Sequence, residues 1–278
     1  MISYVTHSFR NRSLACGLGF ILIGISSVTR LLAATNEIMS IAEIRNLPME
    51  QMNPKTPVRL RGVVTFYDES LFSRFIQDET AGIYLQFPTG VVPPALLPGQ
   101  TVEVVGVWNP GEYAPVVMVE NIQVTGKGEL PPAKPVSFTQ LATGMEDSQF
   151  VEVSGIVRSV QAVEKTSFYQ IDITTGDGRL RVFAKTLPVA QPDELIDSTV
   201  RVRGVCATQF NQQRQLFAIR IMVPVPEDLK IEIPAPEGIM AAAPRPIGSL
   251  LQFTPQESFG HRVKLTGTVI YFEPGVEF

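Results

Sequence analysis

Two adjacent carboxylates are the first residues in this sequence whose types suggest chemistry. Asp78 and Glu79 lie within FIQDETAGIYLQF (75–87), between two apolar runs. Glycoside hydrolysis needs two carboxylates that face each other across a substrate, about 5 to 9.5 Å apart and in different environments. Neighbours at a hairpin tip point apart, and Asp, Thr and Gly are typical turn residues. We therefore interpret the pair as the corner of a β-hairpin rather than as a hydrolase centre.

Other catalytic or metal-binding patterns are missing from the sequence. His261 is the only histidine after residue 34, and a lone histidine without a partner is more often structural than catalytic. Cys206 is the only cysteine after residue 34, so we expect neither an internal disulfide nor a cysteine-based metal site. The sequence has no His-x-x-x-His, Gly-x-Ser-x-Gly or Gly-rich phosphate-loop motif. We predict a chain that is not an enzyme and uses no cofactor or metal.

A candidate binding site lies on the strands that flank the corner. Alternation along 83–87 turns three apolar side chains inward and therefore Tyr84 and Gln86 outward. The loops next to these strands add further polar and aromatic side chains. The predicted ligand-binding residues are Phe72, Arg74, Gln77, Tyr84, Gln86, Trp108 and Tyr113. Barrel core with incidental surface aromatics is the alternative interpretation of the same residues.

The strand that leads into this hairpin recurs along the chain. VRLRGVVTFYD (58–68), VEVSGIVRSVQ (151–161) and VKLTGTVIYFE (263–273) share the pattern V-x-[LV]-x-G-x-V, with apolar and polar residues alternating. Alternation predicts half-buried strands, and the shared glycine predicts a bend or a close backbone approach. Each strand follows a Ser-x-x-Glu/Gln capping box, which predicts a short helix. The boxes are Ser40 to Glu43, Ser137 to Gln140 and Ser249 to Gln252.

A second strand type gives each unit the same order of elements. GQTVEVVGVWN (99–109) and DSTVRVRGVCA (197–207) follow the two hairpins, and a fifth strand follows each of them. A unit of about 100 residues with five short strands predicts an all-β fold of tandem five-stranded OB-like Greek-key barrels, each preceded by a short helix. The predicted divisions are a signal segment (1–34), unit 1 (35–130), unit 2 (131–245) with a Pro-rich linker (225–246), and the start of a truncated unit 3 (246–278).

The two ends of the sequence suggest an exported location and a longer parent chain. Arg10 and Arg12 precede a 15-residue apolar run (14–28), and LLAA (31–34) then ends in small residues. These are the parts of an export signal, and the run is shorter than the ~20 residues that span a bilayer. We favour a cleaved signal peptide over an uncleaved signal anchor, and so a periplasmic or other extracytoplasmic location at the inner membrane. Unit 3 stops after its first strand, which suggests a fragment of a longer chain.

Net charge argues against one class of partner. The whole chain has 23 basic and 27 acidic residues, and segment 1–34 holds three arginines and no acidic residue. The remainder therefore carries 20 basic and 27 acidic groups, a net charge of −7. Proteins that bind phosphate backbones normally show a basic face or a basic excess. We therefore do not expect nucleic acid as a partner.

One stretch resembles a known family. GVVTFYDESLFSRFIQDETAGIYLQF (62–87) resembles the tandem OB-like repeats in the extracytoplasmic N-terminal region of bacterial sensor histidine kinases and hybrid kinases. In that family the pattern G-x-V-T-Y-Y-D…L-F-I-Q-D-x-T-G-G-I-Y-V recurs after a signal peptide, and a membrane-spanning helix and a cytoplasmic kinase follow. GTVIYFEPGVEF (267–278) is similar to the opening of another copy, and TTGDGRLRVFA (174–184) is a looser match.

The resemblance implies a function without catalysis in this chain. It implies the sensory or interaction region of a membrane-bound two-component sensor histidine kinase, whose kinase parts lie outside these residues. The implied partners are an unknown small ligand or protein, and the membrane through the signal anchor or a downstream segment; a homodimer of the parent protein is left open. The alternative is a free exported OB-fold protein that binds oligosaccharide or single-stranded nucleic acid.

Overall fold

The computed structural model describes most of the chain after the first 36 residues. The described residues are 37–47, 56–111, 114–176, 178–211, 213, 215–236, 243–250 and 261–271. Thr35–Phe278 form one compact unit. The predicted signal segment (1–34) lies outside the described residues. Within the ranges given above, no helix is long and apolar enough to cross a membrane.

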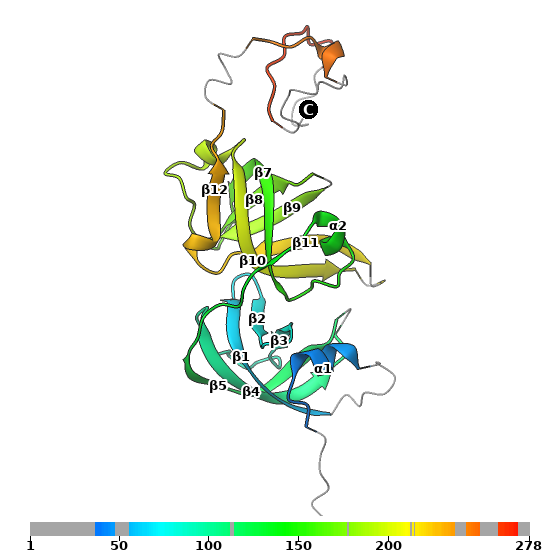
Figure 1. The fold of residues 1–278 in the computed structure, drawn as a ribbon, viewed down its shortest axis with the longest axis vertical. Coiled ribbons are helices and arrows are strands. Elements are labelled where there is room, and N and C mark those ends of the chain that lie inside the picture. The colour runs from blue at the N-terminus through cyan, green and yellow to red at the C-terminus, as the bar shows by residue number, and fades with distance from the viewer. Residues whose placement is uncertain are drawn as a thin grey trace, which may run out of the picture. The chain divides into compact units, whose positions relative to one another are not determined.

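The first barrel consists of five strands in the closed order β1-β2-β3-β5-β4 (Figure 1). Strands β3 and β5 are parallel, and the other neighbours are antiparallel. A short helix, α1 (Ile41–Asn46), precedes the barrel. The strands are β1 (Pro57–Asp68), β2 (Ser73–Gln77), β3 (Gly82–Gln86), β4 (Gln100–Asn109) and β5 (Val116–Lys127).

The second barrel repeats this topology and adds two short strands. Helix α2 (Phe138–Ala142) precedes it, and pairing of β10 with β7 closes it. Its strands are β7 (Phe150–Ala162), β8 (Tyr169–Thr174), β9 (Arg179–Ala184), β10 (Thr199–Phe210) and β11 (Leu216–Met222); the added strands are β6 (Lys134–Pro135) and β12 (Leu229–Ile233). The described residues also include three short 3-10 helices: Pro192–Leu195, Pro226–Asp228 and Ile247–Ser249. The prediction of tandem five-stranded OB-like barrels is confirmed.

The glycine shared by the first strands marks a close backbone approach, as predicted. A Cβ atom added at Gly62 would lie 2.8 Å from the carbonyl oxygen of Gln77, and one added at Gly155 would lie 2.8 Å from that of Thr174. Each glycine sits where strand 1 leaves one neighbour and joins the other, so it lets the strand coil around its barrel.

Only one of the three capping boxes forms in the described residues. Ser137 and Gln140 form both reciprocal bonds, as predicted. Ser40 makes no cap bond with its own helix, so that prediction is wrong. Residues of the β2–β3 turn bind this end of α1 instead: Asp78 and Thr80 accept the first two N–H groups of the helix, and the hydroxyl of Ser40 lies 3.3 Å from that of Thr80. The third box cannot be followed, since Gln252 lies outside the described residues.

Two predictions near the C-terminus differ from the structure. Part of the predicted linker forms β12, because three apolar residues of LKIEI (229–233) alternate with charged ones and pair with β10. The strand predicted at 263–273 does not form within the described part of that segment, where Leu265 makes a single bridge to Arg245. The bridge is parallel, like that of Ile38 to Val58 in barrel 1.

Candidate ligand-binding site

Asp78 stabilises a corner of the fold. One carboxylate oxygen accepts the backbone N–H groups of Thr80 (2.7 Å) and Ala81 (2.9 Å), and the other accepts that of Ile41 (2.8 Å). The side chain therefore closes the β2–β3 turn and caps α1, while Glu79 lies exposed beside it. This geometry supports the hairpin-corner interpretation of the two carboxylates. The expectation that this chain is not an enzyme stays a prediction.

His261 has a partner that sequence reasoning missed. Its Nδ1 lies 3.1 Å from a carboxylate oxygen of Asp197, and the same oxygen accepts the backbone N–H of Arg262 at 3.2 Å. Asp197 is buried and has a φ of 78°. The corresponding position in barrel 1 is Gly99, with a φ of 83°. Asp197 thus holds the start of the third segment.

Three of the predicted binding residues lie together in barrel 1. The hydroxyl of Tyr84 donates to the carbonyl oxygen of Phe72 (3.0 Å) and accepts from the guanidinium of Arg74 (3.2 Å). Arg74 forms an ion pair with Glu69 at 2.6 Å, which lowers the pKa of that carboxyl. Phe72 is exposed and has a φ of 48°. These contacts form a polar rim at one end of β2 and β3.

The other predicted residues are distributed differently. Trp108 is buried in the barrel core with only 2% of its surface exposed, because alternation along β4 turns it inward. Gln86 is exposed, and Tyr113 lies outside the described residues. Gln77 accepts the backbone N–H of Phe150 at 3.0 Å. The ligand-binding role of the whole set stays a prediction.

The outer face of β2 and β3 is covered by barrel 2. Phe75 and Tyr84 pack edge to face, with ring centroids 5.3 Å apart. Both contact a cluster whose other members come mainly from barrel 2: Phe66, Phe150, Phe168, Phe183, Val205, Ala207 and Met222. Burial of apolar surface is the main stabilising term of such a contact. The face on which OB barrels usually hold ligands is therefore a joint in barrel 1.

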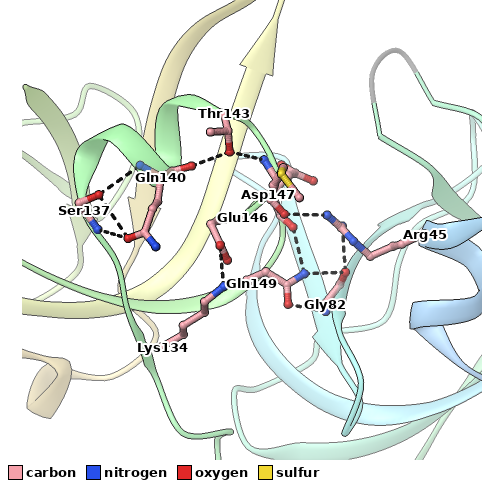
Figure 2. Close-up of polar contacts among 10 residues, drawn as sticks. Arg45, Gly82, Lys134, Ser137, Gln140, Thr143, Glu146, Asp147 and Gln149 are labelled. Carbon is pink, nitrogen blue, oxygen red and sulfur yellow. Dashed lines mark hydrogen bonds and ion pairs between the residues drawn. The ribbon is translucent and has the colours of Figure 1, made fainter.

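Polar contacts fix the position of this joint (Figure 2). The backbone N–H of Gly82 donates to the side-chain carbonyl of Gln149 at 3.2 Å, and the amide of Gln149 donates back to Gly82 at 3.5 Å. Arg45 of α1 donates to the carbonyl oxygens of both Gly82 (3.3 Å) and Met145 (3.2 Å). A Cβ atom at Gly82 would lie 1.9 Å from the carbonyl oxygen of Ser148, so only glycine fits.

Barrel 2 has different side chains on the corresponding face. Phe75 lies opposite Tyr84 across β2–β3, and Asp172 lies opposite Arg181 across β8–β9. Both hairpins have four residues between the last paired positions. Asp172 and Arg181 therefore occupy the places of the aromatic pair, and Arg179 occupies the place of Gly82. The face that is apolar in barrel 1 is charged in barrel 2.

This charged face is open and forms a groove of about 660 Å³. It runs over β7, β8, β9 and β11 and reaches α2. Its lining residues are Phe138, Ala142, Arg158, Ser159, Asp172, Ile173, Arg179, Leu180, Arg181, Leu216, Phe217, Ala218 and Ile219. Three arginines and one carboxylate are among them, a formal charge of +2. The groove therefore combines enough volume for a ligand with an excess of positive charge.

The carboxylate in the groove is held in place, whereas two of the arginines are not. Asp172 accepts from the hydroxyl of Ser159 (2.9 Å) and from the amide of Gln170 (3.1 Å). Within the described part of the chain, neither Arg179 nor Arg181 forms an ion pair. Both side chains are exposed, so their guanidinium groups are available to an anion.

Arg220 lies on β11 beside the groove and is not among its lining residues. It lies opposite Arg181 on the parallel pair β9–β11, and the pairing continues to Asp172 on β8. Burial lowers the pKa of Arg220, and the charge of Arg181 lowers it further. Its Nε is buried without a hydrogen-bond partner among the described residues. An anion near these two arginines would relieve their repulsion.

Sequence reasoning missed this groove because it considered the net charge of the chain. Arg179 and Arg181 lie at alternate positions of RLRVFA (179–184), and Arg220 lies in the middle of LFAIRIM (216–222). Sorting the charges of each predicted strand by outward position would have placed these arginines on one face.

Comparison with known proteins finds similarity to solved structures at low sequence identity. No protein-family model matches the chain, and no curated protein matches it. Matching solved structures include asparaginyl-tRNA synthetase from Pyrococcus horikoshii, with 19% identity, a TM-score of 0.25, and coverage of 35% of this chain and 25% of that one. A murine DNA-binding protein bound with double-stranded DNA matches with 11% identity, a TM-score of 0.29, and coverage of 64% and 99%. The HINa domain of Ifi202 in complex with 20-base-pair DNA matches with 6% identity, a TM-score of 0.29, and coverage of 64% and 96%.

One sequence-based expectation is contradicted by this comparison. Net charge argued against nucleic acid as a partner, yet proteins bound to DNA are among the matching structures. The physical reason is that net charge sums the whole chain, whereas a partner meets one face. The groove of barrel 2 carries positive charge although the chain as a whole is acidic. The likeness itself concerns fold alone and assigns no ligand to this chain.

Proposed function

We propose that this chain is a non-catalytic ligand-binding region, and that the groove of barrel 2 holds the ligand. The difference between two corresponding faces carries the proposal. The face of β2–β3 is aromatic and covered, whereas the face of β8–β9 is charged and open. The outer face of strands 2 and 3 is the usual ligand platform of OB barrels. A role for Asp78 in capping a helix supports the non-catalytic interpretation.

The finer proposal is that the chain belongs to the extracytoplasmic sensory region of a membrane-bound two-component sensor histidine kinase. The resemblance of residues 62–87 to that family supports it, as do the composition of segment 1–34 and the tandem arrangement of barrels. In this function the barrels recognise a signal outside the inner membrane. The kinase reaction belongs to other parts of the parent protein.

Fractionation of the cells that make the protein tests this proposal. An antibody against residues 56–236 should detect a membrane-bound polypeptide much longer than 278 residues. Alkaline phosphatase, which becomes active only after export, should be active when fused after Phe278. A cytoplasmic product together with an inactive fusion would contradict the proposal.

The same experiment decides the alternative function. A soluble periplasmic product of about the length of this chain would indicate a free exported OB-fold protein that binds oligosaccharide or single-stranded nucleic acid. The open groove favours this alternative as much as the first function, because a ligand platform serves both. The membrane fraction therefore distinguishes the two.

A further inference from the structure

The arginines of the groove are spaced for an extended anion. Arg179 and Arg181 occupy successive outward positions of β9, about 7 Å apart on a strand that rises ~3.3 Å per residue. Arg158 lines the same groove from β7. Guanidinium groups bind phosphate through two parallel hydrogen bonds, which gives them direction as well as charge. A ligand with one or two phosphate groups fits this row.

An exposed aromatic ring is part of the groove lining. Phe217 on β11 has 63% of its surface exposed, which is high for a large apolar side chain. Phe138 of α2 also lines the groove. Exposed rings on OB-type platforms stack on the planar faces of bases, and the stacking tolerates any base. The ring therefore favours a ligand that has a flat heterocycle.

Asp172 is the one carboxylate among the described residues that line the groove. Hydrogen bonds from Ser159 and Gln170 fix Asp172 between the arginines, and its remaining lone pairs can accept further N–H donors. A carboxylate in this position repels phosphate, so it is better suited to an exocyclic amino group of a base. The groove thus offers three different contacts within about 660 Å³, a volume that suits a small ligand.

We infer that the groove of barrel 2 binds a nucleotide-type ligand, either a free nucleotide or a short single strand. Its phosphates pair with Arg179 and Arg181, its base stacks on Phe217, and an amino group of the base donates to Asp172. This inference rests on the proposed ligand-binding function and names its ligand. A neutral sugar chain would leave the arginines unpaired.

Binding of a labelled hexadeoxycytidylate to the purified chain tests the inference, with CMP, heparin hexasaccharide and cellohexaose as competing probes. The double substitution Arg179→Glu and Arg181→Glu should weaken binding of the oligonucleotide at least tenfold. It should also reduce the slope of log Kd against log salt by about 1.4, the share of two phosphate contacts on a single strand. The charge-matched control, Lys127→Glu with Lys230→Glu, changes two exposed lysines outside the groove and should leave the affinity within threefold.

The ring is tested separately. Phe217→Ala should weaken binding of both CMP and the oligonucleotide about five- to a hundredfold, the effect of one lost base stack. Oligonucleotide binding at least tenfold tighter than CMP binding would identify a single strand as the ligand, and equal affinities would identify a free nucleotide. Unchanged binding by Phe217→Ala would overturn the inference.

The remaining outcomes separate the inference from the proposed function. Binding of heparin or cellohexaose in the groove, without binding of CMP or the oligonucleotide, would overturn the inference and leave a ligand-binding groove of another class. If the amide NMR signals of β8, β9 and β11 shifted with none of the four probes, that result would contradict both the nucleotide inference and the proposed ligand-binding function.

Discussion

The two barrels share a topology but use the same face in opposite ways. In barrel 1 the outer face of β2–β3 carries the aromatic pair Phe75 and Tyr84 and is buried by barrel 2. In barrel 2 the corresponding pair is Asp172 and Arg181, and the face stays open. Burial of exposed aromatic surface is favourable in free energy, whereas burial of a well-solvated charged pair costs free energy. Two residue positions therefore distinguish a joint from a binding face.

A third pair of corresponding positions, Gly82 and Arg179, adds to the difference between the two faces. Gly82 begins β3 and contacts the backbone of Ser148 so closely that no Cβ atom fits. Arg179 begins β9 at the corresponding place and is exposed. A long charged side chain here prevents another barrel from docking in the same manner. The face of barrel 2 is thus kept free by shape as well as by charge.

Removal of Phe75 should have the largest effect on stability. Phe75→Ala deletes a ring that is 4% exposed within the cluster between the barrels, and we expect it to cost about 3 kcal/mol. The matched control is Phe217→Ala on the open face of barrel 2, which should change stability by less than about 0.5 kcal/mol. Urea titration of both variants measures the difference. Equal losses would show that the two faces do not differ in burial.

A methyl group at Gly82 should loosen the joint. Gly82→Ala forces a clash with the carbonyl oxygen of Ser148 that only a backbone shift can relieve, and we expect a loss of about 2 kcal/mol. Gly176→Ala is the control in the corresponding turn of barrel 2, where a Cβ atom would have no neighbour within 4 Å. Amide exchange at Phe150, whose N–H is bonded across the joint, should accelerate only in the first variant. Slow exchange in both would contradict the proposed contact.

Much of the fold could be predicted from local patterns. Alternation and the shared glycine identified the five strands of each barrel, because those signals arise within each strand. The capping box at Ser40 was wrong because Asp78 and Thr80, far away in sequence, bind the end of α1 instead. Strand β12 was missed because prolines on both sides suggested a linker.

The candidate site could be predicted less well. Outward positions could be inferred from alternation, but which of two similar faces is covered depends on contacts between distant residues. Gln77 and Phe150 are 73 positions apart, and no local pattern of either one indicates their hydrogen bond. For the same reason the predicted site was placed on the face that forms the joint, and the open groove was overlooked.

Loss of that hydrogen bond should have a moderate effect. Gln77→Ala leaves the part-buried N–H of Phe150 without its acceptor, and we expect a cost of about 1 kcal/mol. Gln86→Ala replaces an exposed glutamine on the neighbouring strand and should be neutral within about 0.5 kcal/mol. Thermal unfolding of the two variants under identical conditions provides the comparison. If Gln86→Ala were the more destabilised, the assignment of the covered face would be wrong.

The smallest expected effect is a pH dependence of the joint. Asp68 of β1 pairs with Lys185 of barrel 2 at 2.8 Å. Burial alone would raise the pKa of Asp68, but hydrogen bonds from Lys185 and Ser70 outweigh burial and lower it. A carboxyl whose pKa is lower in the folded state stabilises that state above its unfolded pKa, and this contribution disappears as the pH falls through the folded pKa.

Asp68→Asn should therefore destabilise the chain at pH 7 by less than about 1 kcal/mol, because Lys185 is half exposed and the pair is partly screened. Once the pH falls below the lowered pKa of Asp68 in the folded state, the variant and the original chain should converge, since protonated Asp68 no longer attracts the lysine. Glu79→Gln, at an exposed carboxyl in the turn of barrel 1, should show no such convergence. Urea titrations from pH 8 down to pH 2 measure all three chains. The difference in unfolding free energy between Asp68→Asn and the original chain should therefore shrink at low pH. If this difference stayed constant over the whole range, the ion pair would not contribute to the joint. The stability of the joint would then come from the aromatic cluster alone.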